Sequence, residues 1–145
     1  MKKTSMFLLI ILFSFGCKTE PEAINYGSDE CDFCKMVISN PKFGAELLTK
    51  KGKVYKFDSV ECLAAFSLLK NKNEINSMWV TDYVTPEKFI NSTRAFFLKS
   101  EIQSPMGLNL AAFADAENLK HFGEKYNGNQ LNWESVVNDV KSAWK

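Results

Sequence analysis

The chain has 145 residues, of which 46% are hydrophobic and 24% charged, and its formal net charge is +1. This length suits one ordinary domain, and the composition excludes a disordered chain. The near-neutral charge offers no basic surface, which excludes electrostatic capture of nucleic acid as the function.

The start of the chain is typical of an exported lipoprotein. Two lysines precede an unbroken apolar run, Met6 to Phe13, that suits a signal-peptide core but is too short to span a bilayer. Cys17 follows at the cleavage position, which favours acylation over an ordinary signal peptide with a nearby cysteine. The sequence predicts a signal peptide over 1–16, lipidation at Cys17 and a polar tether over 17–29. The protein is then expected in the cell envelope, anchored to a membrane and facing the periplasm or the exterior.

The folded domain is expected over 30–145, in halves of about 30–75 and 76–145. In the first half, β-prone runs separated by turn residues predict strands, and a polar cap before apolar residues at intervals of three and four predicts a helix. The expected elements are a short strand over 36–38, hairpin strands over 45–49 and 54–57, and a helix from Val60 to about Leu69 capped by Asp58 or Ser59.

The second half repeats this order of elements. Strands are expected over 78–84, 95–99 and 108–113, with a turn over 104–107, a helix from Asp115 or Ala116 to Lys125, and a final helix over 133–144. The strand-to-helix junctions at 57–66 and 110–117 correspond. The predicted fold class is therefore α+β, with two related strand–strand–helix halves packed together, because one unit alone would bury too little surface.

Three cysteines remain beyond Cys17, namely Cys31, Cys34 and Cys62. An odd number leaves at least one thiol without an intramolecular partner. The cell envelope is oxidising, so a persistent free thiol there needs a reason, and a bound metal ion is one such reason.

Two sulfur donors lie close together at Cys34 and Met36. If this segment is extended, both side chains point the same way, and thiolate with thioether selects Cu(I) over hard cations. Met106 stands between Pro105 and Gly107 in the expected turn, where a thioether should be exposed. The competing interpretation is a loop methionine packed against a nearby helix. The predicted metal site is Cys34, Met36 and Met106 binding Cu(I), with Cys31 as a candidate additional metal or redox residue.

Other interpretations of these residues stay open. A zinc site could use Cys31, Cys34, Cys62 and His121, but Cys62 lies on the apolar face of the expected helix and His121 on another helix. A thiol–disulfide oxidoreductase could use Cys31 and Cys34, although that motif usually has a strand before it and a helix after it. A structural lipoprotein with buried or bridged cysteines is the third alternative. No hydrolase motif or phosphate loop is visible, and we expect no enzymatic activity.

Four stretches of the sequence together match the pattern of one known family. They are Cys17, Cys31-Asp32-Phe33-Cys34-Lys35-Met36, Phe57-Asp58-Ser59-Val60-Glu61-Cys62-Leu63, and Ser104-Pro105-Met106-Gly107 followed by Ala111-Ala112-Phe113. In this combination the chain resembles the NosL family, the accessory lipoproteins of nitrous-oxide reductase. The resemblance implies a Cu(I) chaperone that delivers copper to the copper–sulfide centre of that enzyme, with the enzyme and its membrane assembly complex as partners. It also implies two related α/β halves, similar to part of the organomercurial lyases, and it places the copper ligands at Cys34, Met36 and Met106.

The chain departs from the family pattern at two places. Many relatives have Gly where this chain has Lys35, and many have His-Gly-Gly where it has Tyr126-Asn127-Gly128. A histidine ligand from the second place is therefore not available to this chain.

Overall fold

The computed structural model describes residues 20–144. The expected signal peptide over 1–16, the lipidation site at Cys17 and the first residues of the expected tether lie outside this range. Within the described range, no helix is both long enough and apolar enough to cross a membrane.

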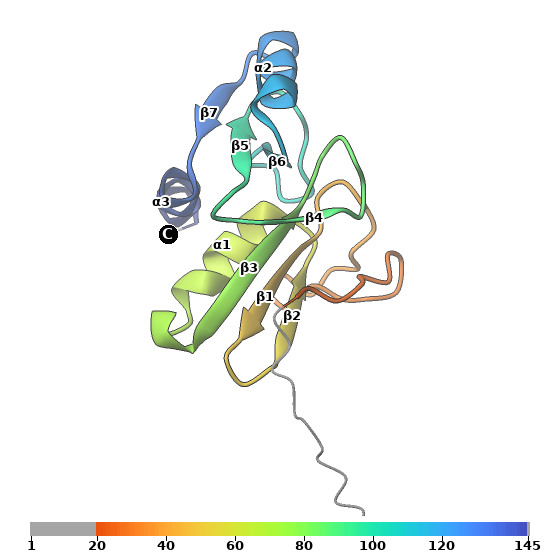
Figure 1. The fold of residues 1–145 in the computed structure, drawn as a ribbon, viewed down its shortest axis with the longest axis vertical. Coiled ribbons are helices and arrows are strands. Elements are labelled where there is room, and N and C mark those ends of the chain that lie inside the picture. The colour runs from red at the N-terminus through yellow and green to blue at the C-terminus, as the bar shows by residue number, and fades with distance from the viewer. Residues whose placement is uncertain (1–19, 145) are drawn as a thin grey trace, which may run out of the picture.

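The first sheet has four antiparallel strands in the order β2-β1-β3-β4, and helix α1 packs on it (Figure 1). A 3₁₀ turn at Lys72–Glu74 joins α1 to β3. The elements are β1 (Ala45–Thr49), β2 (Val54–Phe57), α1 (Val60–Leu68), β3 (Ile75–Thr81) and β4 (Phe89–Asn91).

The second sheet has three antiparallel strands in the order β6-β5-β7, with helix α2 on it, and helix α3 then runs back to pack against α1. Figure 1 shows this smaller unit as the teal and blue end of the molecule. The elements are β5 (Phe96–Lys99), β6 (Leu110–Phe113), α2 (Ala116–Lys125), β7 (Asn129–Leu131) and α3 (Trp133–Ala143).

The two units share one topology. In each, a hairpin is followed by a helix and then by a strand that pairs with the first strand of the hairpin, giving the orders β2-β1-β3 and β6-β5-β7. This confirms two related halves and adds a third strand to each. The sheets divide the chain between β4 and β5, later than the expected boundary near residue 75, because β3 pairs with β1 from Ile75 onward.

Local sequence signals account for most element boundaries. Both hairpin strands of the first unit have their expected bounds, and Gly52 adopts a φ of 82° in the turn between them. Ser59 caps α1 and Asp115 caps α2, each accepting a hydrogen bond from the backbone N–H three residues on. The expected strand over 36–38 is wrong, because only Val37 forms an isolated bridge, to Glu30.

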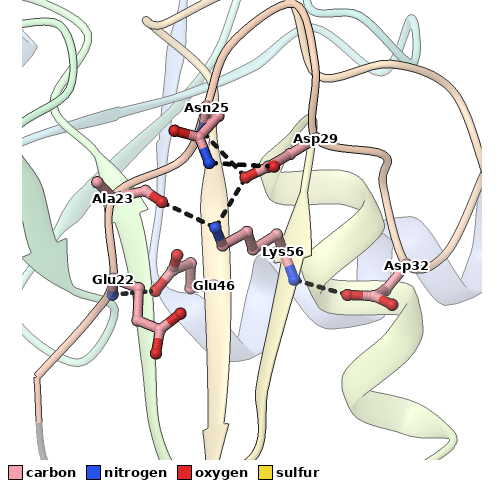
Figure 2. Close-up of polar contacts among 7 residues, drawn as sticks. All are labelled: Glu22, Ala23, Asn25, Asp29, Asp32, Glu46 and Lys56. Atoms are coloured by element: carbon pink, nitrogen blue, oxygen red, sulfur yellow. Dashed lines mark hydrogen bonds and ion pairs between the residues drawn. The ribbon is translucent and has the colours of Figure 1, made fainter.

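The residues before Glu30 pack on the first sheet from Glu22 onward, where the sequence predicted a tether (Figure 2). Ile24 is buried in the main core. Lys56 Nζ donates to the Ala23 carbonyl at 2.8 Å and lies 2.7 Å from Asp29 Oδ2, so β2 holds both ends of this segment. One buried isoleucine and one ion pair give no sequence pattern from which the packing of this segment could have been predicted.

The main core is shared by the two units. Its buried members include Leu47 and Phe57 from the first sheet, Phe97 and Leu110 from the second, and Val136 from α3. A smaller second cluster lies between β5, β6 and α2. The shared core explains how two small sheets form one stable structure, as expected from the surface that each would bury alone.

Candidate metal centre

Three thiols and one carboxylate converge beside the start of α1. The Sγ atoms of Cys31, Cys34 and Cys62 and a carboxylate oxygen of Asp58 all lie within 4.8 Å of one another. Cys31, Cys62 and Asp58 are buried, while Cys34 is half-buried. All three cysteines are free thiols in the structure. The donors come from two segments, the loop over 31–34 and the β2–α1 junction.

The loop that carries Cys31 and Cys34 is fixed to β2 through Asp32. The Asp32 backbone N–H donates to the Lys56 carbonyl at 2.8 Å, and the Lys56 backbone N–H donates to Asp32 Oδ2 at 2.8 Å, the second contact being drawn in Figure 2. Within the loop, the Cys31 N–H donates to the Met36 carbonyl at 2.8 Å. These bonds place both thiols beside the end of β2.

The second pair of donors follows from how α1 begins. Asp58 directly precedes the cap residue Ser59, and the Cys62 backbone N–H donates to Ser59 Oγ at 3.3 Å. Asp58 and Cys62 therefore flank one capping turn. Since the whole first turn of α1 is buried, both side chains point into the protein interior.

The thiols differ in proton affinity. A hydrogen bond from the Cys62 thiol, helped by the backbone N–H groups of Cys34, Asp58 and Phe33, lowers the pKa of Cys31 to about 6 against the opposing effect of burial. Desolvation raises the pKa of Cys34 to about 11. The Cys31 sulfur and the Asp58 carboxylate raise the pKa of Cys62. Of the three thiols, Cys31 therefore loses its proton most readily and forms the thiolate that binds metals.

The cluster is closed on one side and open at Cys34. Between the two loop cysteines, the Phe33 ring stacks on Trp144 at the end of α3, with centroids 5.8 Å apart and an interplanar angle of 8°. Cys31 and Cys62 have no exposed surface. Cys34 is therefore the thiol through which an ion would reach the cluster.

The sequence argument that brought Cys34 and Met36 to one side of a strand is wrong in its premise. Lys35 has a φ of 64°, and Cys34 lies in a turn, so side chains do not alternate across this segment. A left-handed φ is the conformation that Gly adopts without strain, so a non-glycine residue such as Lys35 is less favourable here. The Met36 side chain is 52% exposed. Its role as a ligand stays a prediction.

Met106 lies in the turn between β5 and β6 that the sequence predicted. The Gly107 N–H donates to the Ser104 carbonyl at 3.1 Å, and Gly107 has a φ of 80°. Met106 is half-buried and packs against the core cluster that contains the three cysteines, where exposure was expected. The second unit thus brings this thioether to the core that holds the thiols, and its role as a ligand also stays a prediction.

A buried hydrogen bond ties this turn to α1. Ser104 Oγ donates to Glu61 Oε1 and accepts from the Asn109 N–H at 2.9 Å. Desolvation raises the pKa of Glu61. Since Glu61 directly precedes Cys62, the bond links the turn of Met106 to the helix end that carries one of the thiols.

The zinc set considered from the sequence is assembled only in part. Cys31, Cys34 and Cys62 come together, but His121 is an exposed residue of α2 whose ring contacts Phe122, and it is not a member of the cluster. The fourth member of the cluster is Asp58 and not His121. The sequence pointed to Cys62 as a buried helix residue, and it is buried, but it is also a donor of the cluster.

The comparisons with known proteins agree on one family. The sequence profile of NosL matches residues 23–141. The chain belongs to the NosL family. A curated member, the copper-binding lipoprotein NosL of Stutzerimonas stutzeri, is 27% identical over 150 residues, covering 89% of this chain and 78% of the relative. The crystal structure of the copper chaperone NosL from Shewanella denitrificans superposes with a TM-score of 0.71 at 26% identity, covering 81% of this chain and 95% of that one.

Sequence reasoning missed one member of the cluster and ranked another low. Asp58 was considered only as a possible helix cap, and Cys62 was considered as a zinc ligand but judged more consistent with packing. The available signal was their position, because a residue just before a cap and a residue at the third helical position share one side of the helix start. Their shared position indicates a metal site only once a second segment with donor residues is known to lie against the same side of the helix start.

Proposed function

We propose that this NosL-family chain binds Cu(I) and carries it as a copper chaperone, without catalysing a reaction. The observation that supports this is the convergence of three thiols at one point, with Cys34 at its open side. Soft thiolate and thioether donors prefer Cu(I) to hard cations. The names of the two relatives, a copper-binding lipoprotein and a copper chaperone, point the same way.

In this proposal the ion is held for transfer by Cys34 as thiolate, with Met36 and Met106 as neutral thioether ligands. Cys34 loses its proton on binding, so the affinity rises with pH up to the pKa of that thiol, which burial raises to about 11. A low coordination number leaves room for a ligand of the recipient. The copper then passes by ligand exchange and is never free in solution.

The proposed recipient is nitrous-oxide reductase, at its copper–sulfide centre, together with its membrane assembly complex. Lipidation at Cys17 would keep the chaperone in the envelope, at the membrane where that complex resides. The recipient is tested by mixing Cu(I)-loaded protein with copper-free reductase. We expect copper to move to the reductase in the presence of a chelator that captures free Cu(I).

The copper site is tested by anaerobic Cu(I) titration against a competing chelator. We expect Cys34→Ser to weaken binding by more than about tenfold, or 1.4 kcal/mol, and Met36→Leu and Met106→Leu each to slow the transfer of copper to the chelator. Leu preserves the volume of Met and removes the sulfur. Met78→Leu in β3 is the matched control and should bind as the wild type does.

Unchanged affinity in Cys34→Ser, together with unchanged transfer rates in both Met variants, would remove the proposed function. Loss of affinity in the Met78→Leu control would show that the assay reports folding and not ligation. Circular dichroism of each variant separates these two results.

A further inference from the structure

Two of the three clustered thiols lie deeper than Cys34 and have no place in the carrier site just described. Cys31 and Cys62 are fully buried, yet their Sγ atoms lie within 4.8 Å of each other and of the Cys34 Sγ. We propose that they form, with Cys34, an inner Cu(I) position of three thiolates, and that Cys34 is shared between this position and the outer one. The inference rests on the proposed function, because it concerns where the same ion is held.

The geometry suits a small ion with three sulfur ligands. The thiols come from two segments that are each fixed independently, the loop by Asp32 against Lys56 and the helix by its Ser59 cap. Few side-chain rotations would be needed to bring three sulfurs onto one ion from this starting arrangement. A preorganised site of this kind loses little conformational entropy when the ion binds.

An orphaned buried oxygen supplies a second, independent observation. Asp58 is 3% exposed, and its Oδ1 atom has no hydrogen-bond partner among the described residues. Buried carboxylate oxygens normally have a partner, because leaving one unpaired is costly. A cation among the thiols would compensate the charge of this carboxylate, which no described Lys or Arg side chain does through an ion pair.

The donor set distinguishes Cu(I) from zinc. Zinc in closed sites takes four ligands in a tetrahedron and would recruit the Asp58 oxygen as the fourth. Cu(I) prefers the three soft sulfurs and leaves the hard oxygen outside its coordination sphere. We assign the inner position to Cu(I) because three of the four donors are thiols and the relatives are copper proteins.

The shared thiol defines how the ion would leave. At the inner position all three sulfurs bind as thiolates and release to solvent whatever protons they carried, and copper stays in the Cu(I) state throughout. Exchange of Cys31 and Cys62 for the thioethers of Met36 and Met106 moves the ion outward while the bond to Cys34 is kept. The two displaced sulfurs then take from solvent the protons that they released, so that bonds and charge balance.

The test is X-ray absorption at the copper edge on full-length protein labelled with selenomethionine and loaded with one equivalent of Cu(I). In such protein a methionine ligand appears as Cu–Se scattering and a cysteine ligand as Cu–S scattering. We expect three sulfur neighbours and no selenium. A spectrum with one sulfur neighbour and selenium would overturn the inner position and leave the proposed function standing.

A variant that lacks one inner thiol tests whether the ion moves from the inner to the outer position. In Cys62→Ala we expect Cu–Se scattering to appear and the Cu(I) affinity to fall by about tenfold or more. Asn118→Ala, at the equivalent position of α2, is the matched control and should retain the spectrum of the wild type. If Cys62→Ala fails to fold, the wild-type spectrum still decides the question.

Zinc competition completes the experiment. Zn²⁺ at equal concentration should leave the copper spectrum unchanged, and displacement of Cu(I) by zinc would overturn the assignment of the ion. Failure of the protein to bind Cu(I) at all, with every variant, would overturn the proposed function together with this inference.

Discussion

The two halves of the molecule are built alike, but among the described residues the thiol cluster lies in the first half alone. In each half the hairpin ends in a phenylalanine, Phe57 or Phe113, and the helix cap follows two residues later. At the position before the cap stands Asp58 in the first half and Ala114 in the second. At the third helical position stand Cys62 and Asn118.

Burial is what separates the two helix starts. Helix α1 contacts its own sheet, strand β6 of the other sheet and helix α3, and the whole of its first turn is buried. Helix α2 packs chiefly on its own sheet, and Leu119 is its buried residue. The comparison teaches that the same local structure gathers metal-binding donors only in the copy whose helix start is covered by the rest of the fold.

The largest expected effect on stability concerns a buried position that differs between β1 and β5. By register, Glu46 in β1 occupies the place of Phe97 in β5, and both are fully buried. Desolvation raises the pKa of Glu46 from 4.5 to about 7. Between these two pH values Glu46 is therefore protonated in the folded state and ionised in the unfolded state. The contribution of protonated Glu46 to the free energy of unfolding is complete below pH 4.5 and is lost as pH rises through about 7.

We expect Glu46→Gln to remove this pH dependence. At pH 8 its free energy of unfolding should exceed that of the wild type by up to about 3 kcal/mol, with little difference near pH 4.5. Urea unfolding with a thiol reductant at the two pH values measures this. A variant that kept the pH slope of the wild type would show that another group is responsible, and Glu117→Gln on the surface is the matched control.

The second effect compares Glu61 with Glu117, which stand at the same position of α1 and α2. Glu61 is buried and accepts from Ser104, whereas Glu117 is exposed. Ser104→Ala leaves Glu61 Oε1 and the Asn109 N–H without their partner and should cost about 1–3 kcal/mol. Glu117→Ala should change stability by less than about 0.5 kcal/mol. Equal losses in the two variants, measured by urea unfolding, would contradict the different burial of these positions.

The smallest effect concerns the two helix caps. Ser59→Ala and Asp115→Ala each remove a hydrogen bond to a backbone N–H, of Cys62 or of Asn118, and each should cost about 1 kcal/mol. Ser59→Ala should also weaken Cu(I) binding, because the Cys62 backbone loses its anchor, whereas Asp115→Ala should not. Thermal unfolding and chelator competition measure the two quantities. Weaker copper binding in Asp115→Ala would contradict the location of the thiol cluster at the start of α1.

Elements with a strong local pattern were predictable from the sequence. The hairpin around Gly52, both helix caps and the turn at Ser104 follow from turn and capping chemistry acting over four or five residues. Strands β4 and β7 were missed, since three residues show no period and become strands only by pairing with β3 and β5.

The sequence by itself determined the repeat of hairpin and helix, the soft character of the donors and the presence of an unpaired thiol. These follow from residue type and from spacing along a short stretch of chain. Only the tertiary structure decided that Cys62 and Asp58 face Cys31 and Cys34, and that Met106 packs on their core. The reason is physical: a site made of two segments depends on how they pack, and packing is set by the shared core and not by the residues of the site.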